Sequence, residues 1–151
     1  MADALWNGCR FRTFNVLDEF NREALRIEID TSLPTGRVVR ALNELMELRD
    51  KPRIRLDNGP ELVSQTLAQW ATDNAVELMF TQLGKPTLNA YIERFNRSYR
   101  TEVLDCYVFE SLIEVRQLTK VWMHRYDHER RHWGKFLQWP IVCSNTPTLS
   151  F

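Results

Sequence analysis

Apolar and polar residues alternate in the first third of the chain as expected for a half-buried β-hairpin. The segment RFRTFNVLDEF, residues 10–20, is strand-like. In ALRIEID, residues 24–30, Leu25, Ile27 and Ile29 alternate with charged residues. The short NRE connection between the two segments predicts an antiparallel pair.

The pattern then changes to one that alternates helices with short strands. An apolar stripe in RVVRALNELMELR, residues 37–49, predicts an amphipathic helix. The later segments expected as strand, helix, strand and a long helical region are residues 53–57, 60–76, 77–82 and 89–130. This order predicts an α/β layer protein with mixed strand pairing, a hairpin followed by right-handed crossovers.

Composition excludes several classes of protein. The 151 residues are 44% hydrophobic, which is typical of a globular chain. No apolar run approaches the roughly 20 residues needed to cross a bilayer, and no leader pattern is present at the start. We therefore expect a cytoplasmic protein without membrane contact. The three cysteines, Cys9, Cys106 and Cys143, form no CxxC pair and predict no disulfide framework.

Charge is balanced overall but differs between the two halves. Residues 1–80 carry ten Lys or Arg against thirteen Asp or Glu, whereas residues 81–151 carry ten against seven. An asymmetry this weak does not by itself identify a nucleic-acid partner.

One acidic residue stands at the end of an expected buried strand. In IRLDNGPEL, residues 54–62, Asp57 follows the strand and precedes the turn-forming pair Asn58-Gly59, and then Pro60, which suits a first helical turn. Three interpretations of Asp57 are open: a turn former, a neighbour of a helix N-cap, or a metal ligand.

A second acidic residue lies on a polar helical stripe. In KPTLNAYIERFNRSYRTEV, residues 85–103, Glu93 shares a stripe with amide and arginine side chains, while Ile92, Phe95 and Tyr99 are expected to face the core. From the pattern alone, this stripe is either a solvated helix face with a Glu93–Arg97 pair or a functional surface.

The spacing of the two acidic residues adds a family resemblance. Asp57 and Glu93 are separated by 35 residues. The two blocks LDNGPEL and AYIERFNRSYR, at this spacing, resemble the second half of the acidic triad in retroviral-integrase-like transposases, and the match is closest to insertion-sequence transposases of the OrfB type. The resemblance covers about residues 2–130. It implies a ribonuclease-H-like fold, a mixed sheet flanked by helices.

The resemblance also implies a chemistry. Asp57 and Glu93 would be catalytic residues that each hold one of two Mg²⁺ or Mn²⁺ ions. DNA cleavage and strand transfer are in-line phosphoryl transfers in which two such ions activate the nucleophile and stabilise the leaving oxygen. Hard carboxylate oxygens suit Mg²⁺. Clustered carboxylates repel each other without a cation, so their meeting at a sheet edge indicates metal.

The same resemblance implies contacts with transposon ends and target DNA, and association with the bacterial nucleoid. Basic side chains on the second block would meet phosphates, and its amides would bind backbone or base edges. The DNA-binding candidates are Lys85, Asn89, Arg94, Asn96, Arg97 and Arg100.

Two departures from the family pattern shape the functional expectation. The family's first acidic residue, on the first strand, is expected about two residues before Met1, and neither Asp3 nor Asp18 is expected to replace it. Without that strand, neighbouring backbone groups would lack partners, so the remaining strands would close up or recruit another chain. After a partial catalytic core over residues 1–130, residues 131–151 match nothing in the family and are expected to be irregular.

Three functions remain open at this point. The chain is a transposase fragment whose ancestral activity is metal-dependent DNA cleavage and strand transfer, and which has little or no turnover as it stands. Alternatively, it is a non-enzymatic fragment that binds DNA, associates with itself, or binds and inhibits full-length transposase. The third possibility is a remnant without function. Whether the chain is an enzyme is left open.

Overall fold

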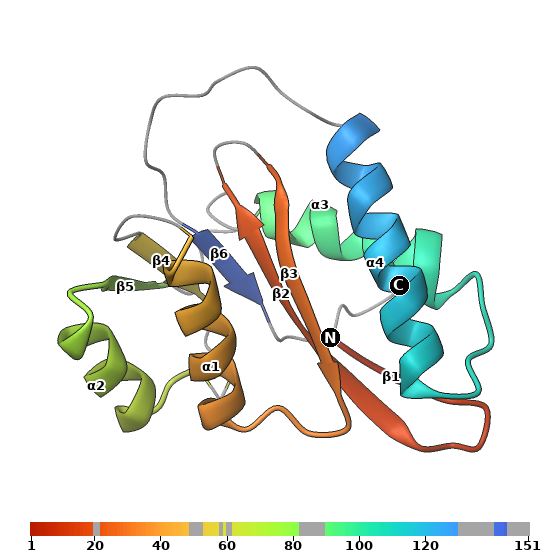
Figure 1. The fold of residues 1–151 in the computed structure, drawn as a ribbon, viewed down its shortest axis with the longest axis horizontal. Helices are drawn as coiled ribbons and strands as arrows, with labels where there is room; N and C mark the ends of the chain where they lie inside the picture. The colour runs from red at the N-terminus through yellow and green to blue at the C-terminus, as the bar shows by residue number, and fades with distance from the viewer. Residues whose placement is uncertain are drawn as a thin grey trace.

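The computed structural model describes residues 1–19, 22–48, 53–57, 59, 62–81 and 90–129, and the backbone of residues 141–144. Within these residues a six-stranded mixed sheet is combined with helices on its two sides (Figure 1). The strands are β1 (Ala2–Ala4), β2 (Arg10–Asp18), β3 (Ala24–Asp30), β4 (Arg53–Leu56), β5 (Glu77–Phe80) and β6 (Ile141–Ser144). The helices are α1 (Thr35–Met46), α2 (Gln65–Asp73), α3 (Ala90–Tyr99), the π-helical turn η2 (Arg100–Leu104) and α4 (Leu112–Glu129).

The predicted hairpin and crossovers are present. β2 pairs with β3 in antiparallel register, with Arg12 opposite Asp30 and Phe14 opposite Glu28. β4 and β5 are parallel and lie at the other end of the sheet, joined through α2. This is the mixed α/β arrangement expected of a ribonuclease-H-like fold, and the predicted fold class is confirmed.

The centre of the sheet differs from the sequence-based expectation. The place between β2 and β4 is filled by β6, which runs antiparallel to β2 and parallel to β4. These four residues belong to the tail that we expected to be irregular, so that expectation is wrong for them. Four residues give no clear periodicity, and a strand buried on both edges is specified by its partners more than by its own pattern.

β1 and β6 use successive parts of one edge of β2. Ser144 of β6 stands opposite Asn15, and Ala2 of β1 stands opposite Arg12. Between them, the backbones of Met1 and Thr13 exchange two hydrogen bonds of 2.8 Å. Both short strands are antiparallel to β2, so β6 and β1 follow one another like two pieces of a single strand.

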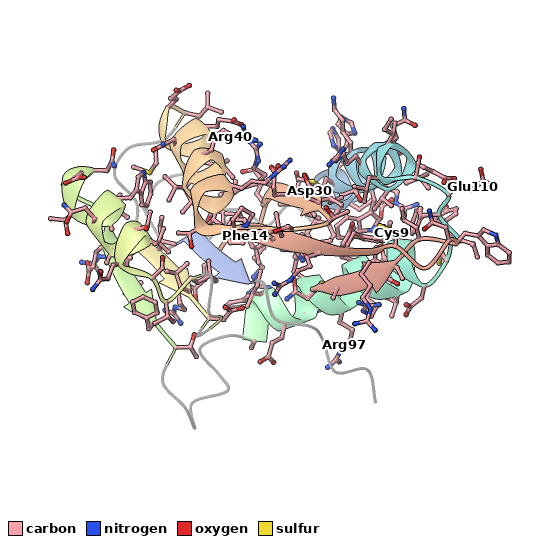
Figure 2. The ribbon with its side chains drawn as sticks, turned by 90° about the horizontal axis from the view of Figure 1, so that it is seen from below. Cys9, Phe14, Asp30, Arg40, Arg97 and Glu110 are labelled. Carbon is pink, nitrogen blue, oxygen red and sulfur yellow. The ribbon has the colours of Figure 1, made fainter. Side chains whose placement is uncertain are left out.

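One hydrophobic core lies on the α1 and α2 side of the sheet. The apolar stripe predicted for the first helix is buried there at Val38, Ala41, Leu42 and Leu45. α2 begins later than predicted, at Gln65, because the hydroxyl of Ser64 caps it by accepting a hydrogen bond of 3.2 Å from the Leu67 amide. The two helices are joined by an indole-to-amide hydrogen bond of 2.6 Å from Trp70 to Asn43. α1 and α3 lie on opposite sides of β2 (Figure 2).

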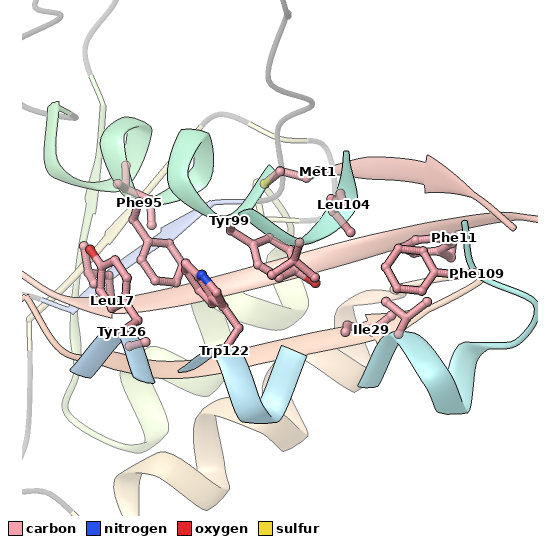
Figure 3. Close-up of a cluster of buried hydrophobic side chains, with 14 of the residues drawn as sticks. Met1, Phe11, Leu17, Ile29, Phe95, Tyr99, Leu104, Phe109, Trp122 and Tyr126 are labelled. Atoms are coloured by element: carbon pink, nitrogen blue, oxygen red, sulfur yellow. The ribbon is translucent and has the colours of Figure 1, made fainter. Parts of the chain in front are cut away.

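The second core joins β2 and β3 to α3, η2 and α4, and it is rich in aromatic rings (Figure 3). The predicted core positions Ile92, Phe95 and Tyr99 are all buried in it, and so is Val103. Trp122, on α4, contacts both Phe95 and Tyr99, with ring centroids 5.5 and 5.2 Å apart. These contacts hold α3 in a fixed position against the sheet.

The long helix expected over residues 89–130 is divided into separate elements. α3 widens into η2, where the Asp105 amide bonds to the Arg100 carbonyl at 2.8 Å, and the chain then leaves the helix before α4 begins. Phe109, in this connection, is buried in the second core. The sequence predicted one continuous helix because buried apolar residues recur both before the connection, in η2, and after it, in α4. Among the described helices, none has the length and apolar character needed to cross a membrane.

Candidate metal and nucleic-acid site

Asp57 directly follows β4 and is fixed by a local turn. Its carboxylate Oδ1 accepts a hydrogen bond of 3.0 Å from the Gly59 amide, the contact by which an aspartate closes a turn two residues on. The residue is 8% exposed, so the carboxylate sits largely out of water. The turn-forming interpretation is therefore correct, and it is compatible with a second role because a carboxylate has further acceptor positions.

The alternation along β4 places Asp57 on the side of the sheet where α3 lies. Ile54 and Leu56 are buried with α1 and α2, so Arg55 and Asp57 belong to the other side. Arg55 Nη2 lies 3.6 Å from Glu19 Oε2, and both side chains are mostly buried. The pKa of the Glu19 carboxyl is raised above its ordinary value, chiefly because burial disfavours the charged form. The Arg55 guanidinium opposes this rise and the Asp18 carboxylate adds to it. Arg55 is thus engaged with another acid on the same side as Asp57.

Glu93 lies in the first turn of α3, on its exposed side. A carboxylate there is favoured by the helix dipole and does not need to be satisfied by the core. α3 itself lies next to β2 and β6. The side of the helix opposite Glu93 is anchored in the second core by Ile92 and Phe95. Glu93 is therefore an accessible acid on a rigid element.

The two carboxylates fit a divalent metal by the chemistry of their donors. Mg²⁺ prefers oxygen ligands, keeps several waters and takes only one or two carboxylates from a protein. Asp57 and Glu93 would be the residues that hold such an ion. Among the described residues, no group of three or more His, Cys, Asp or Glu side chains is gathered as a metal site.

Two of the predicted DNA-binding residues lie on the exposed surface of α3. Arg94 and Arg97 are both exposed, and Figure 2 shows Arg97 pointing away from the sheet. The sequence did not predict a further arginine next to α3. The Arg22 guanidinium lies 4.2 Å from the centre of the ring of Tyr91, which is on the same helix as Glu93. No periodicity in the sequence indicated this contact, because Arg22 comes from the β2–β3 connection.

Asn96 does not belong to this exposed surface. It is 5% exposed, and its Oδ1 accepts a hydrogen bond of 2.7 Å from Nδ2 of Asn15 on β2. In this structure Asn96 is a contact between α3 and the sheet, and its expected contact with DNA stays a prediction. Asn15 was missed, although an amide between Phe14 and Val16 in a buried strand was a signal that a polar partner was needed.

Arg100 is also engaged within the protein. It donates to the Ala2 carbonyl at 2.8 Å and pairs with Asp3 at 3.3 Å and Asp105 at 3.5 Å, and its side chain is 15% exposed. In this conformation it ties β1 to η2, and its expected contact with DNA phosphate stays a prediction. Lys85 and Asn89 lie outside the described residues.

Comparison with known proteins now places the chain in a family. The family described as Integrase core domain matches residues 3–86, more than half of the chain, and a second family with the same description matches residues 74–134. The chain belongs to the integrase core domain family.

Relatives narrow the class to insertion elements. The chain is 41% identical over 133 residues to the insertion element IS407 uncharacterized 31.7 kDa protein of Burkholderia multivorans, covering 87% of this chain and 48% of that protein. It is 37% identical over 131 residues to the insertion element IS476 uncharacterized 39.2 kDa protein of Xanthomonas euvesicatoria, covering 86% of this chain and 38% of that protein. The predicted resemblance to an insertion-sequence transposase with an integrase-like core is confirmed. The chain spans less than half the length of each relative.

A solved structure supports the fold. A chain in the cryo-EM structure of a simian T-cell lymphotropic virus intasome, in complex with the PP2A regulatory subunit B56 gamma, superposes with a TM-score of 0.60. The similarity covers 70% of this chain and 37% of that chain at 20% identity, so it bears on the fold alone.

Proposed function

We propose that this chain is a transposase core whose ancestral reaction is metal-dependent DNA cleavage and strand transfer, with Asp57 and Glu93 as the ligands of Mg²⁺ or Mn²⁺. Bound ions would polarise the phosphate and stabilise the leaving oxygen. Asp57, held by Gly59, would supply a pre-oriented carboxylate, and Glu93 would supply one from α3. Two of the three acids of the family pattern are assigned, so little turnover is expected from this chain alone.

One observation carries this proposal: a largely buried carboxylate at the carboxyl end of β4 and an acid on α3, which packs against the adjacent strand β6, at the family's spacing. A buried carboxylate is unfavourable unless its charge is compensated. The Gly59 amide donates to this carboxylate, and a carboxylate has further acceptor positions that suit a divalent cation.

The first prediction concerns metal affinity. Asp57→Asn and Glu93→Gln should each weaken Mn²⁺ binding by at least about tenfold, because each removes one anionic oxygen donor from the ion. Isothermal titration of Mn²⁺ into the full chain measures the affinity. Glu110→Gln, which alters an exposed acid beyond η2, is the control and should bind like the wild type.

The metal proposal fails if Mn²⁺ binds equally to the wild type and to both site variants, or if it does not bind to a folded wild-type chain. Circular dichroism of every variant establishes that each one is folded. Because the substitutions keep the shape of the side chain and remove its charge, a loss of binding by either site variant reports on the acid itself.

The second prediction concerns the exposed arginines of α3. Arg94→Ala and Arg97→Ala should each weaken binding to a DNA duplex and make the salt dependence shallower by about one released counterion. Arg97→Lys should preserve the salt dependence because it preserves the charge. Fluorescence anisotropy over a salt series provides the measurement. Arg40→Ala, on the exposed face of α1 across the sheet, is the control. Equal affinity and slope for all these chains would exclude α3 as the DNA-binding surface.

A nicking assay separates the enzymatic proposal from the non-enzymatic alternative. Mn²⁺-dependent nicking that Asp57→Asn removes would support a residual transposase activity. Salt-sensitive DNA binding without nicking would support a DNA-binding or inhibitory fragment that acts through association with full-length transposase.

A further inference from the structure

β6 is formed by residues 141–144, which follow all the other described strands and helices in the sequence. Within the described residues it is the strand that connects β2 to β4, through register pairs such as Leu17 with Val142 and Leu56 with Cys143. We propose that the place between β2 and β4 is a strand-acceptor site, and that a second copy of this chain can fill it with its own residues 141–144. The product would be a dimer in which two copies exchange β6.

The acceptor site requires an occupant. When β6 leaves, the backbone donors and acceptors along the paired edges of β2 and β4 lose their partners. Those that stay buried without a new partner are strongly unfavourable. Open edges of this kind are templates for strand addition. The side chains beside the site, Val16, Leu17, Ile54 and Leu56, are almost completely buried, so an empty site would also expose apolar surface.

The occupant that fits best is the same segment from a second copy. The register, direction and neighbours of β6 would be identical in the exchanged dimer, so the local contacts would not distinguish the two arrangements. Exchange of an identical element is a low-cost route to a dimer for this reason. The acceptor edges and the donor segment are both parts of this chain, so no other protein is required.

The connection permits the exchange. Residues 130–140 join α4 to β6, and a chain of this length can extend about 40 Å, which suffices to reach a neighbouring molecule. A segment tethered in this way has an effective concentration of about 1 mM at its own site. A second copy therefore competes with it when the protein concentration approaches that value.

The exchange would also place a strand of the partner copy next to the elements that carry each candidate metal site. α3, which carries Glu93, lies next to β6, and β4, which ends before Asp57, pairs with it. In the dimer each site would therefore be supported by a strand from the partner. The inference itself does not depend on metal or DNA binding and is tested without either.

A disulfide can record which copy supplies the strand. Val16 stands opposite Cys143 in the antiparallel ladder, where backbone spacing allows a disulfide. We would use Val16→Cys in the full chain after replacing the exposed Cys9 and Cys106 with serine. Cysteine is a small apolar residue and should be tolerated in place of the buried valine. Mild oxidation followed by a non-reducing gel separates intrachain from interchain bonds.

At about 10 µM, we expect the bond between positions 16 and 143 to be mostly intrachain. At about 1 mM, the interchain fraction should rise at least about tenfold. Mixing ¹⁴N and ¹⁵N protein before oxidation should give mixed-isotope peptides that join position 16 to position 143. Thr13→Cys is the control, since position 13 on the same strand pairs with Ile29 and not with β6.

A second variant keeps the proposal testable if the wild-type connection strongly favours the monomer. Deleting residues 132–139 leaves three residues between α4 and β6, which span at most about 14 Å. A connection too short to reach its own site leaves exchange as the way to pair β6, so the interchain fraction should rise at both concentrations. The proposal is overturned if the 16–143 bond stays intrachain at about 1 mM in both chains, if it never forms, or if Thr13→Cys gives an equal interchain product.

Discussion

A chain with Val142→Pro should lose about 3 kcal/mol of its free energy of unfolding, because a strand hydrogen bond is removed and its partner is left unsatisfied within the sheet. Val142 lies in the middle of β6, opposite Leu17 on one side and Arg55 on the other. Proline has no amide hydrogen to donate to a neighbouring strand, and it is excluded from central strands for that reason. Because β6 joins β2 to β4, the loss would divide the sheet beneath the core of α1 and α2, which includes Val16 of β2 and Leu56 of β4, as well as remove one hydrogen bond.

Urea unfolding followed by tryptophan fluorescence measures this effect, since Trp70 and Trp122 lie in the two different cores and both contribute to the signal. Thr148→Pro is the matched control, because it places the same residue outside β6, and we expect a smaller change. If the two proline variants are equally stable, β6 does not pair in the centre of the sheet in solution.

Phe95→Ala should be similarly destabilising, by about 4 kcal/mol, because it leaves a cavity at the centre of the aromatic core. Phe95 is fully buried and contacts Trp122 and Tyr126, with centroids 5.5 and 5.1 Å apart, the second in an edge-on arrangement. Loss of these ring contacts adds to the loss of buried area.

The same unfolding measurement applies, with Tyr91→Ala as the control on the same helix. Tyr91 is partly exposed and its ring contacts Arg22, so we expect a change below about 1 kcal/mol. Since α3 carries Glu93, Phe95→Ala should also weaken Mn²⁺ binding in molecules that remain folded. A change in stability of less than about 1 kcal/mol for Phe95→Ala would contradict the packing described here.

The elements with a clear hydrophobic period were predictable from the sequence. The hairpin of β2 and β3, the buried stripe of α1 and the core positions of α3 all agree with the structure, because burial on one side leaves a period of two or of 3.6 residues. The period does not report where a helix stops. It therefore carried the predicted helix through the connection that contains Phe109.

β6 was not predictable by the same means. A four-residue strand has too few positions to show a period, and its place depends on edges of β2 and β4 that are distant in the sequence. The expectation that the remaining strands would close up or recruit another chain addressed the same backbone groups. The structure shows that β6, a segment of the same chain, pairs with the edges of β2 and β4.

The candidate site was predictable in its residue types but not in their surroundings. The sequence could mark Asp57 and Glu93 by spacing, and it could mark the polar stripe of α3. It could not separate the exposed Arg97 from the buried Asn96 next to it, because one position on a helix turns the side chain by 100° and the limit of the buried face depends on the partner. Nor could it show that Asp3 and the Ala2 carbonyl engage Arg100.

The order in which β6 and β1 follow one edge of β2 makes the fold suited to circular permutation. Ser144 stands opposite Asn15, while Met1 bonds to Thr13, so one inserted residue opposite Phe14 would join the two ends in register. New termini would then be opened between Glu129 and Ile141, and residues 145–151 would be removed. The rearranged polypeptide would start with an unbroken strand along β2 and end with α4. The pairing of β6 with β2 would become a contact between segments close in sequence, which lowers the contact order.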